Sequence, residues 1–265
     1  MEILLAAIFA LLGLSFGSFI NVCIDRLPAN KSLIHPRSHC DACQHQLSSR
    51  DLIPVVSYLW LRGRCRYCQE RIPRRVLLVE VLSGVYFLLA FWRFGLGDEF
   101  VSTVIYGSIF LAIVFIDWEH QLILNKITYP TAAVALIVLA VCSALPQMGL
   151  VSNLVFLPEP AILSGLIGGA IGFGFFLAVL LISPRGMGMG DVKLAGLIGL
   201  ITGFPLVLVA LFIGISTGGV VAAALLLLRK RGRKDMIPFG AFLALGLMVT
   251  LLYGKHILSW YLGMF

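Results

Sequence analysis

The stretch LAGLIGLITGFPLVLVALFIGISTGGVVAAALLLL (residues 194–228) decides how many times this chain would cross a membrane. It is almost entirely apolar, but its 35 residues are too many for one ordinary span and too few for two spans of about 20 residues each. The tripeptide GFP at residues 203–205 offers a break, because a proline inside a helix removes a backbone hydrogen bond. We therefore expect a short span over about residues 191–202 and a full span over residues 204–228.

The composition of the chain is that of a membrane protein. Its 265 residues are 60% hydrophobic and only 12% charged, with a mean hydropathy of +0.99, far outside the range of ordinary soluble domains. The first apolar run, residues 3–24, follows only Met1 and Glu2. It lacks the basic region and the cleavage site of a secretory signal, so we expect it to remain as a span.

Five further apolar runs are long enough to cross a hydrocarbon core of about 30 Å. They cover residues 76–92, 100–116, 127–145, 160–182 and 236–253. With the first run and the two parts of the long stretch, they predict an all-α polytopic membrane protein of about eight transmembrane helices. The predicted domains are a first transmembrane helix (1–24), a cytosolic loop domain (25–75) and a transmembrane domain of about seven helices (76–265).

The Lys and Arg residues indicate the orientation, because cytoplasmic loops of membrane proteins carry an excess of both. With eight spans and the N-terminus outside, residues 25–75 contribute ten of them, and Lys126, Arg185, Lys193 and the cluster RKRGRKD (229–235) contribute eight more. Eighteen of the twenty basic residues would then face the cytoplasm. We attribute the pI of about 9.3 to this topology, and expect a lipid bilayer but no nucleic acid as a partner.

Two aspartates fall at the same depth in this topology. Asp117 ends the third span and Asp191 begins the sixth, both on the cytoplasmic side. Two neighbouring carboxylates in a low-dielectric place cannot both ionise, so one keeps a proton. The ionised aspartate can then deprotonate a water while the protonated one polarises a peptide carbonyl, which is the chemistry of an aspartyl protease.

Glycines around Asp191 fit a peptide substrate. Gly188 and Gly190 have no Cβ and would let another backbone approach closely, with Lys193 one turn further on. Structural roles are the alternatives: Asp191 as a helix cap, and Asp117 as an interfacial carboxylate paired with Lys126 or a basic loop. Ionisable groups within membrane segments are nevertheless functional candidates by default.

Four cysteines in the large loop have the spacing of a metal site. Cys40, Cys43, Cys65 and Cys68 form two CxxC pairs separated by 21 residues, which suits a structural Cys₄ zinc site. Two disulfides are the alternative, but a cytoplasmic loop disfavours them because thiols stay reduced there. Glu80, about one turn inside the second span, is either paired with Arg74 or Arg75 or part of a site.

Several motifs together resemble the type IV prepilin peptidase family, also called the leader peptidase/N-methyltransferase family. They include GSFINVCIDRLP, HPRSHCDAC, IPVVSYLWLRGRCRYC, IDWEHQLILNKIT, GMGDVKLAGLIG with its GxGD core, and IPFGAFLALG. The resemblance covers nearly the whole chain. It implies that Asp117 and Asp191 are the catalytic pair, that the 76–265 domain is catalytic, and that the full Cys₄ loop places the chain in the bifunctional bacterial branch.

The resemblance also implies what the protein would act on. Such enzymes cut the basic leader of type IV prepilins or type II secretion pseudopilins at the cytoplasmic face of the bacterial inner membrane, and then methylate the new N-terminus with S-adenosylmethionine. The methyl transfer is thought to use the cytosolic domain. Within it we choose Gly63, Arg64 and Glu80 as the candidate methyl-transfer region, since a glycine beside a cation could admit a cofactor carboxylate; no GxGxxG fingerprint occurs in the loop. A tight turn before Cys65 is the alternative role for Gly63.

Other classes of function remain open from the sequence. The chain could be a peptidase without methyltransferase activity, or a non-enzymatic membrane scaffold whose zinc loop binds a partner and whose aspartates only cap helices. A transporter is a third class, since broken helices and buried carboxylates also mark ion pathways. Two aspartates at equal depth favour the enzyme.

Overall fold

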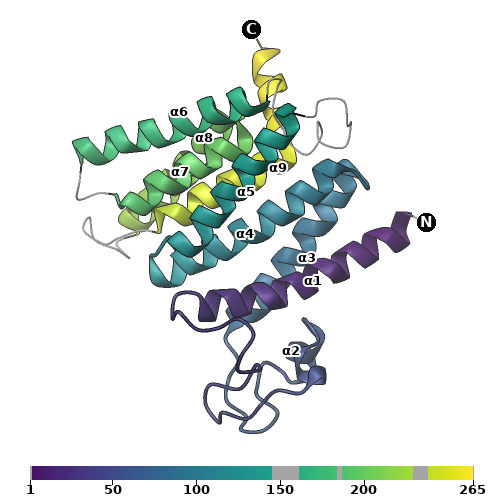
Figure 1. Cartoon of the computed structure of the whole chain (residues 1–265). Coiled ribbons are helices and arrows are strands. Elements are labelled where there is room, and N and C mark those ends of the chain that lie inside the picture. Colours follow the sequence, from purple (N-terminus) through teal and green to yellow (C-terminus); the bar gives the residue numbers. More distant parts are fainter. Residues whose placement is uncertain (1, 145–160, 184–186, 229–237, 265) are drawn as a thin grey trace. The chain divides into compact units, whose positions relative to one another are not determined.

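The computed structural model describes residues 2–144, 161–183, 187–228 and 238–264. Over these residues the chain forms helices and no extended strand (Figure 1). It divides into two compact units, Met1–Gly95 and Leu96–Phe265. The cluster at 229–235, Arg185, Gly186 and the predicted starts of two spans at residues 160 and 236 lie outside the described residues.

The first unit is built on two long helices, α1 (Glu2–Arg26) and α3 (Arg74–Phe94), that pack along each other (Figure 1). Glycines on α1 make the close approach possible. A Cβ on Gly17 would lie 2.6 Å from Cα of Glu80, and one on Gly13 would lie 2.8 Å from the carbonyl oxygen of Ser83. The Asn21 amide completes the contact by donating to the carbonyl of Val76 at 3.0 Å. The pair therefore packs backbone against backbone, as small residues allow in membranes.

The loop between α1 and α3 contains little regular structure. It has a 3₁₀ turn, η1 (Ser49–Leu52), and one short helix, α2 (Val56–Trp60). One isolated antiparallel bridge precedes them, between His39 and Gln46, and another follows them, between Arg64 and Arg71. The loop has one buried apolar side chain, that of Cys65. A segment that buries so little needs another source of stability, such as a metal.

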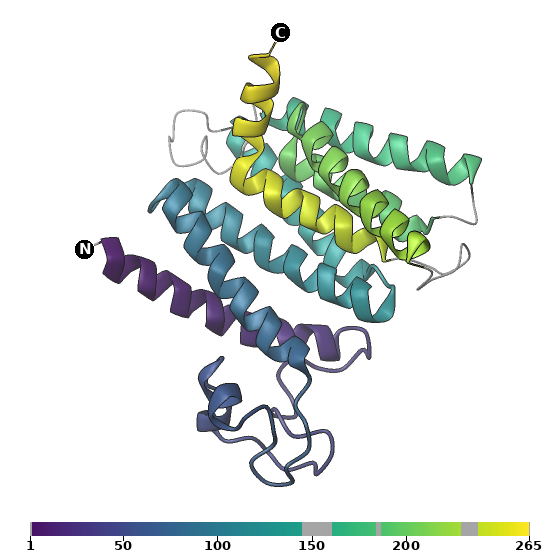
Figure 2. The ribbon, with the colours of Figure 1, turned by 180° about the vertical axis from the view of Figure 1, so that it is seen from behind.

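Among its described residues, the second unit contains six helices. They are α4 (Asp98–His120), α5 (Asn125–Ala144), α6 (Ala161–Ile182), α7 (Met189–Thr202), α8 (Leu206–Leu227) and α9 (Phe239–Leu262). The short α7 packs against α5, α6, α8 and α9 (Figure 2), and α4 packs against α9. Most residues of α7 are buried, so it forms the centre of the unit.

The predicted division of the long apolar stretch is confirmed. Among the described residues, seven helices are long and apolar enough to cross a membrane, and α7 is a further, shorter helix of 14 residues. At about 1.5 Å per residue, α7 is too short for a hydrocarbon core of about 30 Å. The last helix runs to Leu262, beyond the expected end at residue 253.

The break between α7 and α8 is closed by hydrogen bonds. Gly203, at a φ of 65°, ends α7 and donates to the carbonyl of Gly199. Phe204 donates its N–H to the carbonyl of Ser164 on α6 at 3.1 Å and accepts the Ser164 hydroxyl at 2.8 Å. Because lipid offers no hydrogen bonds, a helix can break inside a membrane only where protein supplies them.

Glycines bring α6 and α7 into backbone contact. A Cβ on Gly172 would overlap the carbonyl oxygen of Ala195, and one on Gly199 would overlap the carbonyl oxygen of Gly168. Gly174, two residues along α6 from Gly172, would meet nothing within 4 Å. The contact thus depends on particular glycines and not on the glycine content of α6.

We predict that Gly172→Ala destabilises the protein by about 1–3 kcal/mol, because the added methyl overlaps backbone that cannot rotate away. Gly174→Ala is the matched control and should leave stability unchanged or raise it slightly, since alanine favours helix. The midpoint of thermal unfolding in detergent measures both variants. Equal effects of the two substitutions would contradict this account of the α6–α7 contact.

Candidate functional site

Asp117 lies at the C-terminal end of α4 and is 5% exposed. Its Oδ2 accepts the N–H of Ala241 at 2.8 Å, in the first turn of α9. A Cβ on Gly240 would lie 3.1 Å from the same oxygen. The carboxylate therefore sits at a helix N-terminus, where free N–H groups and the helix dipole favour negative charge.

Asp191 lies in the first turn of α7, three residues after its N-cap Gly188. Its Oδ2 accepts the N–H of Gly188 at 3.2 Å. This is half of a capping box, in which the third residue of a helix reaches back to the N-cap backbone. The capping role considered from the sequence is thus present, and it holds the carboxylate at the helix end.

The structure brings the two aspartates together within the second unit. Oδ2 of Asp117 lies beside Gly240, and Asp191 directly follows Gly190. Ile123, in the link between α4 and α5, lies beside both: a Cβ on Gly190 would be 3.0 Å from Ile123 Cβ, and a Cβ on Gly240 would be 2.7 Å from Ile123 Cδ1. Gly190 and Gly240 therefore leave a space next to the aspartates that Ile123 fills.

Lys193 joins α7 to α5. Its Nζ donates to Oδ1 of Asn125 at 3.2 Å and lies 5.3 Å from the centre of the Tyr129 ring. Asn125 and Tyr129 are one turn apart at the start of α5. In this structure the ammonium group therefore holds two helix ends together beside the aspartates.

The four loop cysteines lie in one cluster. The sulfurs of Cys40, Cys43, Cys65 and Cys68 are all within 4.8 Å of one another, and those of Cys40 and Cys68 are 3.7 Å apart. Tetrahedral zinc with Zn–S bonds of about 2.3 Å separates its sulfurs by about 3.8 Å. All four thiols are free, so the arrangement is that of a metal site and not of two disulfides.

Each CxxC pair sits in the same type of turn. In the first, Cys40 receives the N–H of Gln44 and donates to the carbonyl of His45; in the second, Cys65 receives that of Gln69 and donates to the carbonyl of Glu70. Both glutamines have positive φ, 57° and 61°. The repeat is visible in the sequence as CDACQ and CRYCQ, a signal that the spacing of the cysteines alone does not use.

The surroundings act in opposite directions on the thiols of Cys65 and Cys68. The backbone N–H groups of Cys68 and Tyr67 lower the pKa of the Cys65 thiol to about 7. The N–H of Glu70 acts the same way on Cys68, but burial and the neighbouring thiols outweigh it and raise the pKa of Cys68 to about 12. Four thiolates this close cannot all ionise unless a cation balances them.

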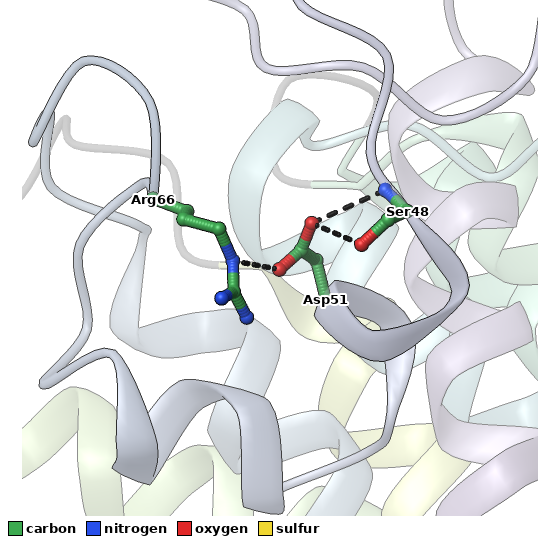
Figure 3. A network of polar contacts seen from close by, with 3 residues as sticks. All are labelled: Ser48, Asp51 and Arg66. Atoms are coloured by element: carbon green, nitrogen blue, oxygen red, sulfur yellow. Dashed lines mark hydrogen bonds and ion pairs between the residues drawn. The ribbon is translucent and has the colours of Figure 1, made fainter.

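An acidic residue ties the second CxxC turn to the middle of the loop. Asp51, whose side chain is 3% exposed, pairs with Nε of Arg66 at 2.7 Å. Its other oxygen accepts the hydroxyl of Ser48 at 2.7 Å and the backbone N–H of Ser48 at 3.1 Å (Figure 3). Burial raises the pKa of Asp51, but these hydrogen bonds outweigh it and hold that pKa below its usual range.

The candidate methyl-transfer residues do not form one cluster. Gly63 has a φ of 69° and lies against the Tyr58 ring, where a Cβ would come within 2.9 Å of the hydroxyl, so it serves the turn after α2. Arg64 is exposed and its backbone bridges to Arg71. Glu80 lies on α3 and contacts Val55, at the opposite end of α2 from Gly63 and Arg64.

Glu80 has a structural partner that the sequence did not suggest. The residue is buried, and Oε2 accepts the backbone N–H of Val55 at 2.8 Å. Ser18 on α1 lies on the same side as this carboxylate. Arg75, considered as its ion-pair partner, pairs with Asp25 at 2.6 Å. Glu80 therefore fastens the loop to the helix pair.

We predict that Cys65→Ser lowers the bound metal from about one ion per chain to near zero and unfolds the loop, because a structural metal site contributes folding energy directly. Cys23→Ser, outside the cluster, is the control and should keep the metal. Elemental analysis of purified protein measures the metal content. Full metal in Cys65→Ser, or no metal in the unmodified protein, would refute the site.

The fold and the site define a class: a multi-pass helical membrane protein with paired aspartates at two helix ends and a Cys₄ loop. Two known families match the chain. The Bacterial Peptidase A24 N-terminal domain matches residues 11–94, and the Type IV leader peptidase family matches residues 104–223. The chain belongs to the type IV leader peptidase family, as the sequence motifs predict.

Curated relatives match over nearly their whole length. The prepilin leader peptidase/N-methyltransferase of Bacillus subtilis (strain 168) is 30% identical over 97% of this chain and 98% of its own. That of Aeromonas salmonicida (strain A449) is 29% identical over 96% of this chain and 92% of its own. That of Pseudomonas aeruginosa is 29% identical over 95% and 91%. No solved structure matches the chain.

Proposed function

We propose that this protein cleaves the leader of type IV prepilins or type II secretion pseudopilins and then methylates the new N-terminus. The carrying observation is the meeting of Asp117 and Asp191 at two helix ends of one unit. Relatives named prepilin leader peptidase/N-methyltransferase, which match nearly the whole chain, support both activities.

Hydrolysis follows from the two carboxylates. One aspartate is ionised and takes a proton from a water placed between them, and the other is protonated and donates a hydrogen bond to the scissile carbonyl. The water oxygen forms a bond to the carbonyl carbon while the C=O π bond breaks, and the carbonyl oxygen takes the proton of the protonated aspartate, giving a neutral tetrahedral diol. Collapse of the diol breaks the C–N bond, and the leaving amine receives a proton. No covalent intermediate with the enzyme forms.

The glycines beside the aspartates supply the place for the peptide. Gly190 and Gly240 border a space that Ile123 fills in this structure. A substrate backbone that reaches the aspartates occupies this space and displaces the Ile123 side chain. Gly188 and Lys193 lie on the same helix start as Asp191 and border the approach.

The orientation follows from the basic residues. Eighteen of twenty lie on one side of the predicted topology, which puts the aspartates and the Cys₄ loop at the cytoplasmic face of the bacterial inner membrane and the N-terminus outside. The functional division is a first helix (1–24), a cytosolic loop domain (25–75) and a catalytic transmembrane domain (76–265).

The cofactors are assigned to the loop. Zinc fits the four thiols, and its role is structural because four thiolates leave no open coordination position. S-adenosylmethionine supplies the methyl group when bound. Arg64 fits that group as an exposed cation able to pair with its carboxylate, whereas Gly63 is enclosed by Tyr58 and Glu80 is occupied by Val55. Of the three residues chosen for the methyl-transfer region, Arg64 is therefore the proposed contact to the cofactor, while Gly63 and Glu80 shape the loop around α2.

We predict that Asp117→Asn and Asp191→Asn each reduce leader cleavage at least a thousandfold, because an amide keeps the shape but cannot transfer the proton. Asp98→Asn, at the opposite end of α4 from Asp117, is the matched control and should cleave normally. Mass spectrometry of a prepilin incubated with purified protein measures cleavage. Substantial cleavage by a folded aspartate variant would contradict the catalytic role of the pair and would favour the alternative in which the carboxylates only cap helices.

We predict that Arg64→Ala lowers N-terminal methylation at least tenfold while cleavage continues, because the arginine lies in the loop and the aspartates lie in the other unit. Arg50→Ala, also exposed in the loop, is the control. Cleaved product and its N-terminal mass are read in one reaction, with metal content checked. Unchanged methylation would show that Arg64 does not contact the methyl donor and that its segment only forms the turn before Cys65.

A further inference from the structure

The segment between the two CxxC turns has an unusual surface. Residues 52–61 carry no charge, and every exposed residue among them is large and apolar. These are Leu52, Ile53, Val56, Leu59 and Trp60, with exposures from 41% to 82%. We call them the α2 face. In water, a helix presents its polar side outward, so this arrangement is the reverse of what a solvated loop requires.

The CxxC turns of the same loop show the ordinary pattern. Their exposed residues are mainly polar or charged, among them Asp41, Gln44, Arg66, Gln69 and Glu70. The loop thus has one polar part and one apolar part. Within α2, Val56 and Trp60 are four residues apart and lie on one helix side, with Leu59 next to them. Large contiguous apolar patches mark interaction surfaces.

The anchor of α2 fixes its depth. Val55, directly before α2, donates its N–H to Glu80 at 2.8 Å. Glu80 lies six residues after Arg74, the first residue of α3, and therefore about 9 Å further along the helix axis. Gly17, against which Glu80 packs, lies nine residues before the end of α1. Both helices are candidate membrane spans. The start of α2 is consequently held alongside the membrane-spanning part of α3, further into the span than the arginines that begin this helix.

The backbone is held in this place at a cost. Val55 has a φ of 62°, a conformation that β-branched residues avoid. The hydrogen bond from its N–H to a buried carboxylate keeps it there, and such strained residues persist only where the surroundings fix them. Figure 1 shows α2 at one side of the loop that contains it.

We propose that the α2 face inserts into the bilayer at the boundary between headgroups and acyl chains, and so holds the Cys₄ loop against the membrane. An uncharged stretch of ten residues is too short to span and is typical of an interfacial segment. Trp60 is the most exposed of the five residues, and tryptophan favours this boundary. Arg50 and Arg62 bracket the stretch and suit anionic headgroups.

The test uses the full chain in vesicles of phosphatidylethanolamine and phosphatidylglycerol. A variant with Trp92, Trp118 and Trp260 changed to Phe keeps Trp60 as its only tryptophan. Lipid brominated on the acyl chain should quench Trp60 at least threefold, and aqueous iodide should quench it little. A tryptophan-free chain carrying Tyr67→Trp, in the second CxxC turn, is the control and should show the opposite pattern. Metal content confirms that each loop is folded.

Two results would overturn the proposal: quenching of Trp60 by iodide as in the control, which means water, or protection from both quenchers, which means cover by protein. If the multiple variant does not fold, the difference in quenching between unmodified protein and Trp60→Phe gives the same answer. Independently, Leu59→Glu should speed hydrogen exchange of the Val55 amide at least tenfold in vesicles, and Gln46→Glu should not. Unchanged exchange in Leu59→Glu also contradicts insertion.

Discussion

The rest of this structure depends on one constraint: a backbone that is interrupted inside a membrane must find its hydrogen bonds within the protein. The second unit interrupts its helices after α7 and before α9, and each of these two interruptions is satisfied by a group distant in sequence. Ser164 serves the break after α7, and Asp117 receives the N–H of Ala241. The polar atoms that close the helix ends are therefore the same kind of atoms that chemistry needs.

This explains how the carboxylates can be structural and also serve the hydrolysis that we propose. Asp191 caps its own helix through Gly188, and Asp117 caps another. Each carboxylate uses one oxygen for a backbone N–H, so its position is fixed before any substrate arrives. Preorganised charge of this kind is what a catalytic pair requires. Capping and catalysis were weighed as alternatives from the sequence, but the geometry makes them compatible.

The first unit solves a different problem with other means. Its loop has almost no core, and three local devices replace one: the sulfur cluster, the Asp51–Arg66 pair and the Glu80–Val55 hydrogen bond. The sulfurs and the ion pair hold the loop to itself, while Glu80 holds it to the helices. A loop tied in this way keeps a fixed position relative to the α1–α3 pair even though it buries few apolar side chains.

The sequence by itself determined what short-range chemistry specifies. Proline and glycine at residues 203–205 marked the break of the long apolar stretch, hydropathy gave the helices to within a few residues at most ends, and the CxxC spacing gave the sulfur cluster. Tertiary structure alone decided which distant groups meet: Ala241 with Asp117, 124 residues apart, Ile123 with Gly190 and Gly240, and Val55 with Glu80. These contacts could not be predicted, because nothing in the local sequence specifies which distant group a backbone N–H or an isoleucine will contact. The packing of whole helices chooses the partner, through glycines that let two backbones touch.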